Sequence, residues 1–254
     1  MAERICHRRK ASMKWQKESG KNIEKEIRTW LELVMGVAMV CLVAVLVRGI
    51  TVTETVAMDV EREYVVVLDA GHGGVDPGKV GVDGTLEKEI NLHIALQLKE
   101  YLEAADVTVL LTRETDEGLY QSSDTNKKRS DMEARCAMIR NASPDLAVSI
   151  HQNSYHEESV KGAQVFYYEK SQEGMRLAQI LQQGFDRVLG EENTRQAKAN
   201  DQYYLLLHTS CPVVIVECGF LSNWEETIKL SDEGYQERLA WAIHLGILQY
   251  LNET

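Results

Sequence analysis

Proline is scarce in this sequence, with three in 254 residues, and no segment repeats or is of low complexity. A proline-rich linker is therefore excluded. Phosphate-binding patterns are missing too: the glycines at 71, 73 and 74 have neither the GxGxxG nor the Walker spacing. We expect them to let the backbone turn tightly and approach a metal or substrate. The hydrophobic fraction of 44% is ample for the buried core of a globular protein.

Cysteine pairs at a metal-binding or disulfide-framework spacing are absent as well. The five cysteines include no Cys-x-x-Cys pair, and their odd number fits neither a disulfide framework nor a zinc ribbon. Cys136 and Cys218 lie in apolar stretches, so we expect small core residues there rather than reactive thiols.

After Arg48, basic residues are much fewer than acidic residues. Residues 1–48 hold ten Lys or Arg and five Asp or Glu, whereas residues 49–254 hold 18 basic and 34 acidic residues. The resulting net charge of −16 excludes nonspecific nucleic-acid binding by this larger part of the chain. Negative charge also concentrates cations, although most acidic surfaces are simply solvated.

An uncharged run at residues 33–47 predicts a membrane segment near the N-terminus. A fifteen-residue helix spans about 22 Å, so flanking residues would have to extend it across the ~30 Å hydrocarbon layer. We expect a transmembrane anchor or uncleaved signal segment at 31–48, after a basic cytoplasmic N-terminus at 1–30. A cleavable signal peptide ending near Ala57 and a buried core helix are the alternatives.

The rest of the chain is expected to be a linker at 49–63 and a single domain at 64–254, in which strand and helix patterns alternate. Strands are expected at 64–69, 107–113, 145–151, 162–169 and 212–220, and helices at 86–105, 125–142, 172–189 and in a last segment that ends near Leu251. The alternation predicts an α/β fold with a mostly parallel central sheet flanked by helices.

Three of the expected strands end in residues that can bind a metal or move a proton. VVVLDAGH ends at His72, LAVSIH at His151 and VVIVE at Glu217. Ligands of open α/β sheets gather at the carboxyl ends of the strands, so we expect these side chains to converge. A catalytic zinc commonly takes three His or carboxylate ligands and keeps a fourth position for water. His72 and His151 are therefore candidate zinc ligands.

A third ligand is expected in the first turn of the helix at 86–105. Glu87 fits because the helix dipole favours an anion there, and Glu89 is the rival on another face of the helix. Glu217 is the candidate general base, since a carboxylate at the end of a buried strand needs a partner such as a cation. The alternative for this carboxylate is an ion pair with an arginine such as Arg113 or Arg135.

Four motifs bring these residues together: LDAGHGGVDPG, EKEINLHIALQLKEYLE, SIHQNS and VECGFLSN, with LLTRETD as further support. Together they resemble the zinc-dependent N-acetylmuramoyl-L-alanine amidases of the amidase-3 type. The likeness runs from about Val65 to Leu251. It departs at Ala70, where the family usually has proline, and this change should loosen the turn without removing a ligand.

The resemblance implies a role for each candidate residue. His72, Glu87 and His151 would bind one zinc ion, Glu217 would act as the catalytic base, and Asn153 would contact substrate near the cleft. The implied reaction is hydrolysis of the amide in peptidoglycan that joins the lactyl group of N-acetylmuramic acid to the L-alanine of the stem peptide.

Within that family, the short anchor and the polar stretches at 120–131 and 192–198 look like the sporulation amidase of endospore formers. This likeness implies work on spore cortex peptidoglycan before a deacetylase completes the muramic δ-lactam. It also implies an extracytoplasmic, membrane-anchored domain and an activating partner such as a lipoprotein. Two alternatives are a noncatalytic, membrane-tethered peptidoglycan-binding protein on the same fold and a zinc carboxypeptidase of similar fold.

Overall fold

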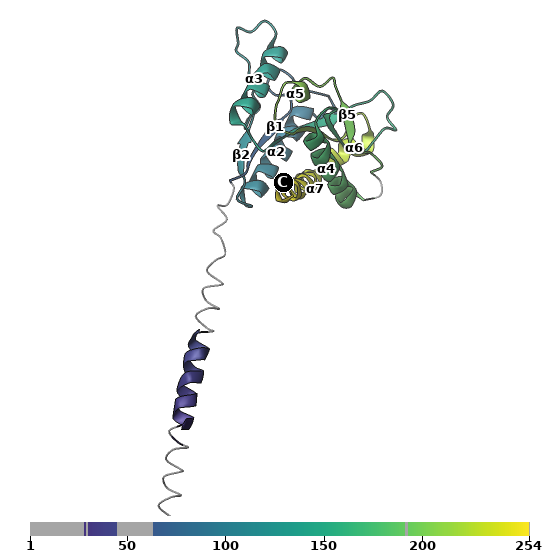
Figure 1. Cartoon of the computed structure of the whole chain (residues 1–254). Coiled ribbons are helices and arrows are strands. Elements are labelled where there is room, and N and C mark those ends of the chain that lie inside the picture. Colours follow the sequence, from purple (N-terminus) through teal and green to yellow (C-terminus); the bar gives the residue numbers. More distant parts are fainter. Residues whose placement is uncertain (1–27, 29, 45–62, 191–192, 254) are drawn as a thin grey trace, which may run out of the picture. The chain divides into compact units, whose positions relative to one another are not determined.

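The computed structural model describes residues 28, 30–44, 63–190 and 193–253, in two units divided between Arg62 and Glu63. In the first unit, residues 30–44 are helical (Figure 1). No helix in the described ranges combines the length and the apolar character needed to cross a membrane. Residues 45–48 of the expected anchor, the expected linker as far as residue 62, and nearly all of 1–30 lie outside the described residues.

The second unit is built on a six-stranded sheet. Its strands, in the order β2-β1-β3-β6-β4-β5 across the sheet, are β1 (Val65–Ala70), β2 (Thr108–Leu111), β3 (Leu146–Asn153), β4 (Gln164–Tyr168), β5 (Lys198–Asn200) and β6 (Val213–Phe220). All neighbours pair in parallel except β4 and β6, which are antiparallel. The prediction of a mostly parallel sheet in an α/β domain is confirmed, and β4 makes the sheet mixed.

Helices cover both faces of this sheet (Figure 1). They are α2 (Glu87–Glu103), α3 (Lys127–Ala142), α4 (Gln172–Leu189), α5 (Tyr204–Leu207), α6 (Trp224–Leu230) and α7 (Glu233–Asn252). One buried cluster joins α2, α4 and α7 to the sheet, and a smaller one joins α3 and α5 to its other face. Because both faces are covered, all eight residues of β6 are buried.

Side chains alternate between these two clusters along each central strand. In β6, Val214 and Val216 pack toward the larger cluster, whereas Val213 and Ile215 pack toward the smaller one. Cys136 and Cys218 are both buried, which confirms their prediction as core residues. The period of two fixes which face of the sheet each strand residue joins.

Candidate active site

Strands β1, β3 and β6 lie side by side and are parallel, so their carboxyl ends meet at one edge of the sheet. His72 follows β1 by two residues, His151 lies near the end of β3, and Glu217 lies in β6. In the pairing of β3 with β6, His151 is directly opposite Glu217. The structure thus brings the three residues from the strand ends to a single place.

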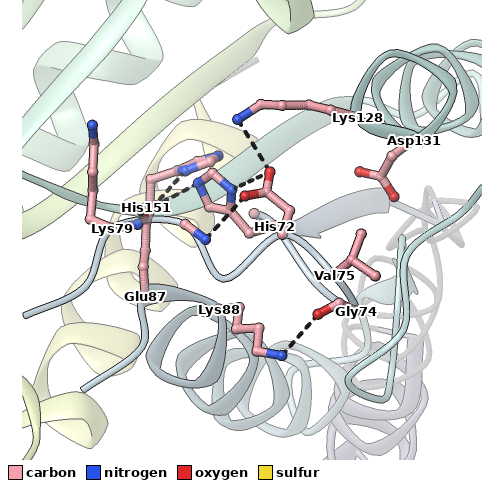
Figure 2. A network of polar contacts seen from close by, with 12 residues as sticks. His72, Gly74, Val75, Lys79, Glu87, Lys88, Lys128, Asp131 and His151 are labelled. Carbon is pink, nitrogen blue, oxygen red and sulfur yellow. Dashed lines mark hydrogen bonds and ion pairs between the residues drawn. The ribbon is translucent and has the colours of Figure 1, made fainter. Parts of the chain in front are cut away.

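The side chains of His72, Glu87 and His151 point toward one another at this edge (Figure 2). Glu87 Oε1 lies 3.2 Å from His72 Nε2 and 2.9 Å from His151 Nδ1. Each residue offers one ligand atom, and the three atoms lie within 4.8 Å of one another. Glu89, the rival third ligand, is exposed on α2 and is not part of this group. The spacing suits one ion held by all three residues.

The Glu87 carboxylate is fixed by backbone amides as well as by the histidines. Its Oε2 accepts a hydrogen bond from the Lys79 amide at 2.7 Å, and its Oε1 accepts one from the Gln152 amide at 3.0 Å. Burial acts to raise the pKa of Glu87, but hydrogen bonds with His151 and His72 outweigh it and hold the pKa far below its usual value. Glu87 is therefore charged, as a metal ligand must be.

His72 is held in a backbone conformation that is uncommon for any residue but glycine. Its φ is 63°, and Arg135 donates a hydrogen bond to its carbonyl oxygen at 2.6 Å. On the side chain, Nδ1 lies 3.0 Å from Asp76 Oδ2. Lys128 reaches over from α3 toward the His72 turn (Figure 2), and its Nζ lies 3.3 Å from the same Asp76 oxygen. The Asp76 carboxylate thus orients the imidazole so that Nε2 faces Glu87.

Two glycines leave the space that the candidate ligands occupy. A Cβ atom on Gly71 would overlap the imidazole ring of His151. On Gly78, where φ is 71°, a Cβ would lie 2.5 Å from Glu87 Oε2 and 2.7 Å from His72 Cδ2. The glycine-rich turn therefore makes room first of all for the side chains of the candidate ligands.

Glu217 is nearly inaccessible to solvent, with 6% of its surface exposed. Its Oε1 accepts a hydrogen bond from the Tyr203 hydroxyl at 3.4 Å, and its Oε2 has no partner within the described part of the chain. Burial raises the pKa of Glu217 to about 7, against the opposing effect of His151. A carboxyl group that titrates near neutral pH can both accept and return a proton.

The ion-pair alternative for Glu217 is not what the structure has. Arg135 instead pairs with Asp69, with 2.6 Å between Nη1 and Oδ1. Arg113 donates its hydrogen bonds to backbone carbonyl oxygens at 2.7 to 3.1 Å. Both arginines therefore bind backbone carbonyl oxygens of the turn that holds His72. Neither forms an ion pair with Glu217.

Asn153 ends β3, two residues beyond His151. Its Oδ1 accepts a hydrogen bond from the Ser154 amide at 2.8 Å, and the side chain is half-buried. Its side-chain nitrogen, Nδ2, makes no hydrogen bond to any described residue, so the side chain has a free donor at this end of the strand. The role of Asn153 in binding substrate stays a prediction.

Two polar residues of the site, Asp76 and Tyr203, were not predicted from the sequence. Asp76 could have been identified from the sequence, because it is a carboxylate four residues after His72 within the same glycine-rich turn. Tyr203 could not have been identified, since it comes from a segment far from Glu217 in sequence and next to the short helix α5, which was not predicted. Only the fold brings this hydroxyl to the carboxylate.

The donor set fits a catalytic zinc ion. Two imidazole nitrogens and one carboxylate oxygen are a common zinc-ligand combination, and sites with three protein ligands keep a fourth position for water or substrate. Glu217 Oε2, which has no hydrogen-bond partner among the described residues, adds a basic group on the strand next to His151. The arrangement is therefore suited to metal-assisted hydrolysis.

The chain matches the family model of N-acetylmuramoyl-L-alanine amidases over residues 66–249. The germination-specific N-acetylmuramoyl-L-alanine amidase of Bacillus subtilis (strain 168) is 36% identical over an alignment of 192 residues, which covers 74% of this chain and 80% of that protein. The N-acetylmuramoyl-L-alanine amidase LytC of the same strain is 31% identical over 187 residues, which are 73% of this chain and 35% of that longer protein.

Solved structures agree with this match. The CwlD amidase from Clostridioides difficile, determined in complex with the GerS lipoprotein, is 41% identical with a TM-score of 0.74, covering 76% of this chain and 100% of that one. The N-acetylmuramoyl-L-alanine amidase from Clostridium difficile 630 is 31% identical with a TM-score of 0.65, covering 75% of this chain and 97% of that one.

Proposed function

Because this chain belongs to the N-acetylmuramoyl-L-alanine amidase family and is a peptidoglycan hydrolase, we propose that His72, Glu87 and His151 bind one zinc ion and that Glu217 is the catalytic base. The observation that carries the proposal is the approach of three ligand atoms to within 4.8 Å of one another, at the same strand ends as the buried Glu217 carboxylate. A zinc ion bound there would supply Lewis acidity, which polarises the substrate carbonyl and acidifies water.

The reaction breaks the amide between the lactyl carbonyl carbon of N-acetylmuramic acid and the nitrogen of L-alanine. The oxygen of water forms the new bond to that carbon, while Glu217 accepts a proton from the water and donates it to the leaving nitrogen. The products are a lactyl carboxylate on the glycan and a peptide with a free amino group. A pKa of about 7 suits both halves of this transfer.

Asn153 is proposed as a substrate contact in the same site. Its position at the carboxyl end of β3 supports this role, because it lies two residues beyond His151. With its oxygen bound to the Ser154 amide, the side chain offers its NH₂ group as a donor. A carbonyl oxygen of the glycopeptide is the matching acceptor.

The test uses the full chain, purified peptidoglycan and mass spectrometry of the products. The wild-type protein should bind one zinc ion and release peptides, leaving lactyl carboxylates on the glycan. Glu217→Gln should lower kcat by about 10²- to 10⁴-fold while zinc content is unchanged, and His151→Ala should lose zinc. His156→Ala is the control, since that side chain is 72% exposed in a loop and outside the ligand group.

Three results would count against this proposal. Full activity of Glu217→Gln would remove that carboxylate from the mechanism, and full zinc content of His151→Ala would overturn the ligand set. Shortened stem peptides without new lactyl carboxylates would instead indicate a carboxypeptidase.

We further propose that residues 64–254 are the catalytic domain of a membrane-tethered enzyme of the spore cortex. Residues 31–48 would be the anchor, 49–63 the linker and 1–30 the cytoplasmic end, a topology supported by the uncharged run and its basic flank. The name of the germination-specific relative supports the cortex assignment. The complex of the CwlD amidase with the GerS lipoprotein supports an activating lipoprotein partner on the same membrane surface.

Muropeptide analysis of an endospore-forming host tests the cortex assignment. Spores without this chain should lack muramic δ-lactam, and the wild-type chain should restore it whereas Glu217→Gln should not. Normal lactam content without the chain would place its activity in the vegetative wall instead.

A further inference from the structure

The Glu217 carboxylate has a single hydrogen-bond donor in the described part of the chain, the hydroxyl of Tyr203. The distance from Tyr203 Oη to Glu217 Oε1 is 3.4 Å, and Oε2 is buried without a hydrogen-bond partner among the described residues. A carboxylate can rotate about its side-chain torsions unless the groups around it prevent this. The orientation of Glu217 therefore depends on how firmly the Tyr203 hydroxyl is itself held.

Tyr203 is fixed by contacts to two neighbouring strands. Its backbone amide donates to Asn200 Oδ1, at the end of β5, at 2.9 Å. Its ring packs edge-on against Phe166 of β4, with 5.6 Å between ring centroids and 81° between ring planes. It also occupies the N-cap position of α5 and accepts a hydrogen bond from the Leu207 amide. These contacts aim the hydroxyl across β4 at Glu217.

The space beside the carboxylate explains why this one donor matters. A cavity with a volume of about 90 Å³ adjoins both side chains. Much of its wall is apolar, from Met132, Leu205 and Ile215. The polar residues Asp69 and Ser149 also line it, but the Ser149 hydroxyl donates to Asp69. Tyr204 also lines the cavity, but its ring stacks on His208 and it makes no hydrogen bond to Glu217. A Glu217 side chain released from Tyr203 would thus have room to turn.

We propose that Tyr203 is a positioning residue, which holds Glu217 in the rotamer that faces His72, Glu87 and His151. The inference rests on the proposed role of Glu217 as the base. Loss of the hydroxyl leaves substrate binding intact but lets the carboxylate occupy unproductive rotamers. A base misplaced by about 1 Å can cost as much as 100-fold in rate, so the loss should be in kcat and not in KM.

The experiment compares Tyr203→Phe with Tyr204→Phe in the zinc-loaded full chain. Tyr204 is a matched control because it is the next residue and lines the same cavity, but its ring stacks on His208, with 3.8 Å between centroids, and its hydroxyl makes no hydrogen bond to Glu217. We expect Tyr203→Phe to lower kcat about 10- to 100-fold, with KM within about twofold and zinc content unchanged. Tyr204→Phe should resemble the wild type in all three.

The pH profile separates positioning from a loss of folded protein. A hydrogen bond from Tyr203 favours the charged form of Glu217, so its removal should move the acidic limb of the kcat/KM profile to higher pH. A purely structural defect would reduce the active fraction and leave the position of that limb unchanged.

The same set of proteins distinguishes the two hypotheses. If Glu217→Gln is inactive but Tyr203→Phe keeps the wild-type kcat and pH profile, the positioning role is overturned while the proposed function stands. Loss of zinc or of thermal stability in Tyr203→Phe, in proportion to its loss of kcat, would also overturn it. If Glu217→Gln is fully active, the proposed function fails and the inference falls with it.

Discussion

The conformation of His72 depends on two neighbouring side chains. Its left-handed φ of 63° costs energy for a residue with a Cβ, and such strain persists where surrounding contacts fix it. Arg135 fixes the carbonyl group, and Asp76 fixes the ring through Nδ1. In this conformation, His72 Nε2 faces Glu87 and His151 without an ion bound. Strain at this residue is therefore tied to the candidate metal site.

Asp76→Asn is expected to weaken zinc binding. The neutral amide no longer strengthens the basicity of the His72 ring, and loss of such an outer carboxylate typically lowers metal affinity by about 10- to 100-fold. Competition with a chromophoric chelator measures the affinity. Asp83→Asn is the matched control, since that carboxylate is exposed and bonded to Thr85 in the next loop. Equal affinities for Asp76→Asn and the wild type would exclude the orienting role.

Some residues of the site can be predicted from the sequence, and others cannot. His72, His151 and Glu217 were expected to converge because apolar strands end in them, and they lie together in the structure. Spacing alone could not choose between Glu87 and Glu89, because both lie in the first turn of α2. Tyr203 could not be found at all, since its contact with Glu217 exists only after β4, β5 and β6 have paired.

At the scale of the elements, the hydrophobic pattern of the sequence predicts whether a segment is a helix or a strand. It does not predict the direction in which a strand pairs, and it misses very short elements. The apolar run of β4 was predicted as a strand, but nothing in such a run shows that it pairs antiparallel with β6. The three-residue strand β5 and four-residue helix α5 are too short to give a period. The last helical stretch is two helices, α6 and α7, because Asp232 caps the second one through the Tyr235 amide.

Gly71→Ala should disturb the close approach of β1 and β3. The added methyl group would overlap the His151 ring, so the ring must move away from Glu87. We expect a loss of about 1–3 kcal/mol in the free energy of unfolding, together with weaker zinc binding. Denaturant titration and metal analysis measure the two effects.

Gly234→Ala is the control for this substitution. It adds the same methyl group in the first turn of α7, where the nearest atom is a side-chain oxygen of Asp232 at 3.3 Å, and alanine is the better helix former. Unchanged zinc binding in Gly71→Ala would show that His151 tolerates the methyl group, contrary to the overlap in this structure.

At the scale of the whole catalytic unit, one buried ion pair links the core to the site. Arg135 of α3 is 1% exposed and contacts Asp69 of β1, whose carboxylate also accepts hydrogen bonds from Thr112 and Ser149. The same arginine holds the His72 carbonyl. The same ion pair therefore stabilises the fold of this unit and the position of His72. Protonation of Asp69 at low pH should weaken both.

The pH dependence of stability follows from the carboxylate of that pair. Burial acts to raise the pKa of Asp69, but Arg135 and the Ser149 hydroxyl outweigh it and lower the pKa to about 2, from 3.8 in the unfolded chain. A lowered pKa stabilises the fold at pH values above 3.8, and the contribution disappears as the pH falls toward 2. From this shift we expect Asp69 to contribute about 2 kcal/mol that is lost between pH 5 and pH 2.

Urea titrations of the zinc-free full chain measure this contribution. Asp69→Asn should be less stable than the wild type at pH 5, because it leaves the buried Arg135 with one partner fewer. The gap between the two proteins should narrow by about 2 kcal/mol as the pH falls to 2, since only the wild type has this proton to take up. Asp201→Asn changes an exposed carboxylate, so its free energy of unfolding should equal that of the wild type at both pH values. A gap for Asp69→Asn that stays constant with pH would mean that Asp69 keeps the same pKa in the folded and unfolded chain, and that Arg135 does not stabilise its charge.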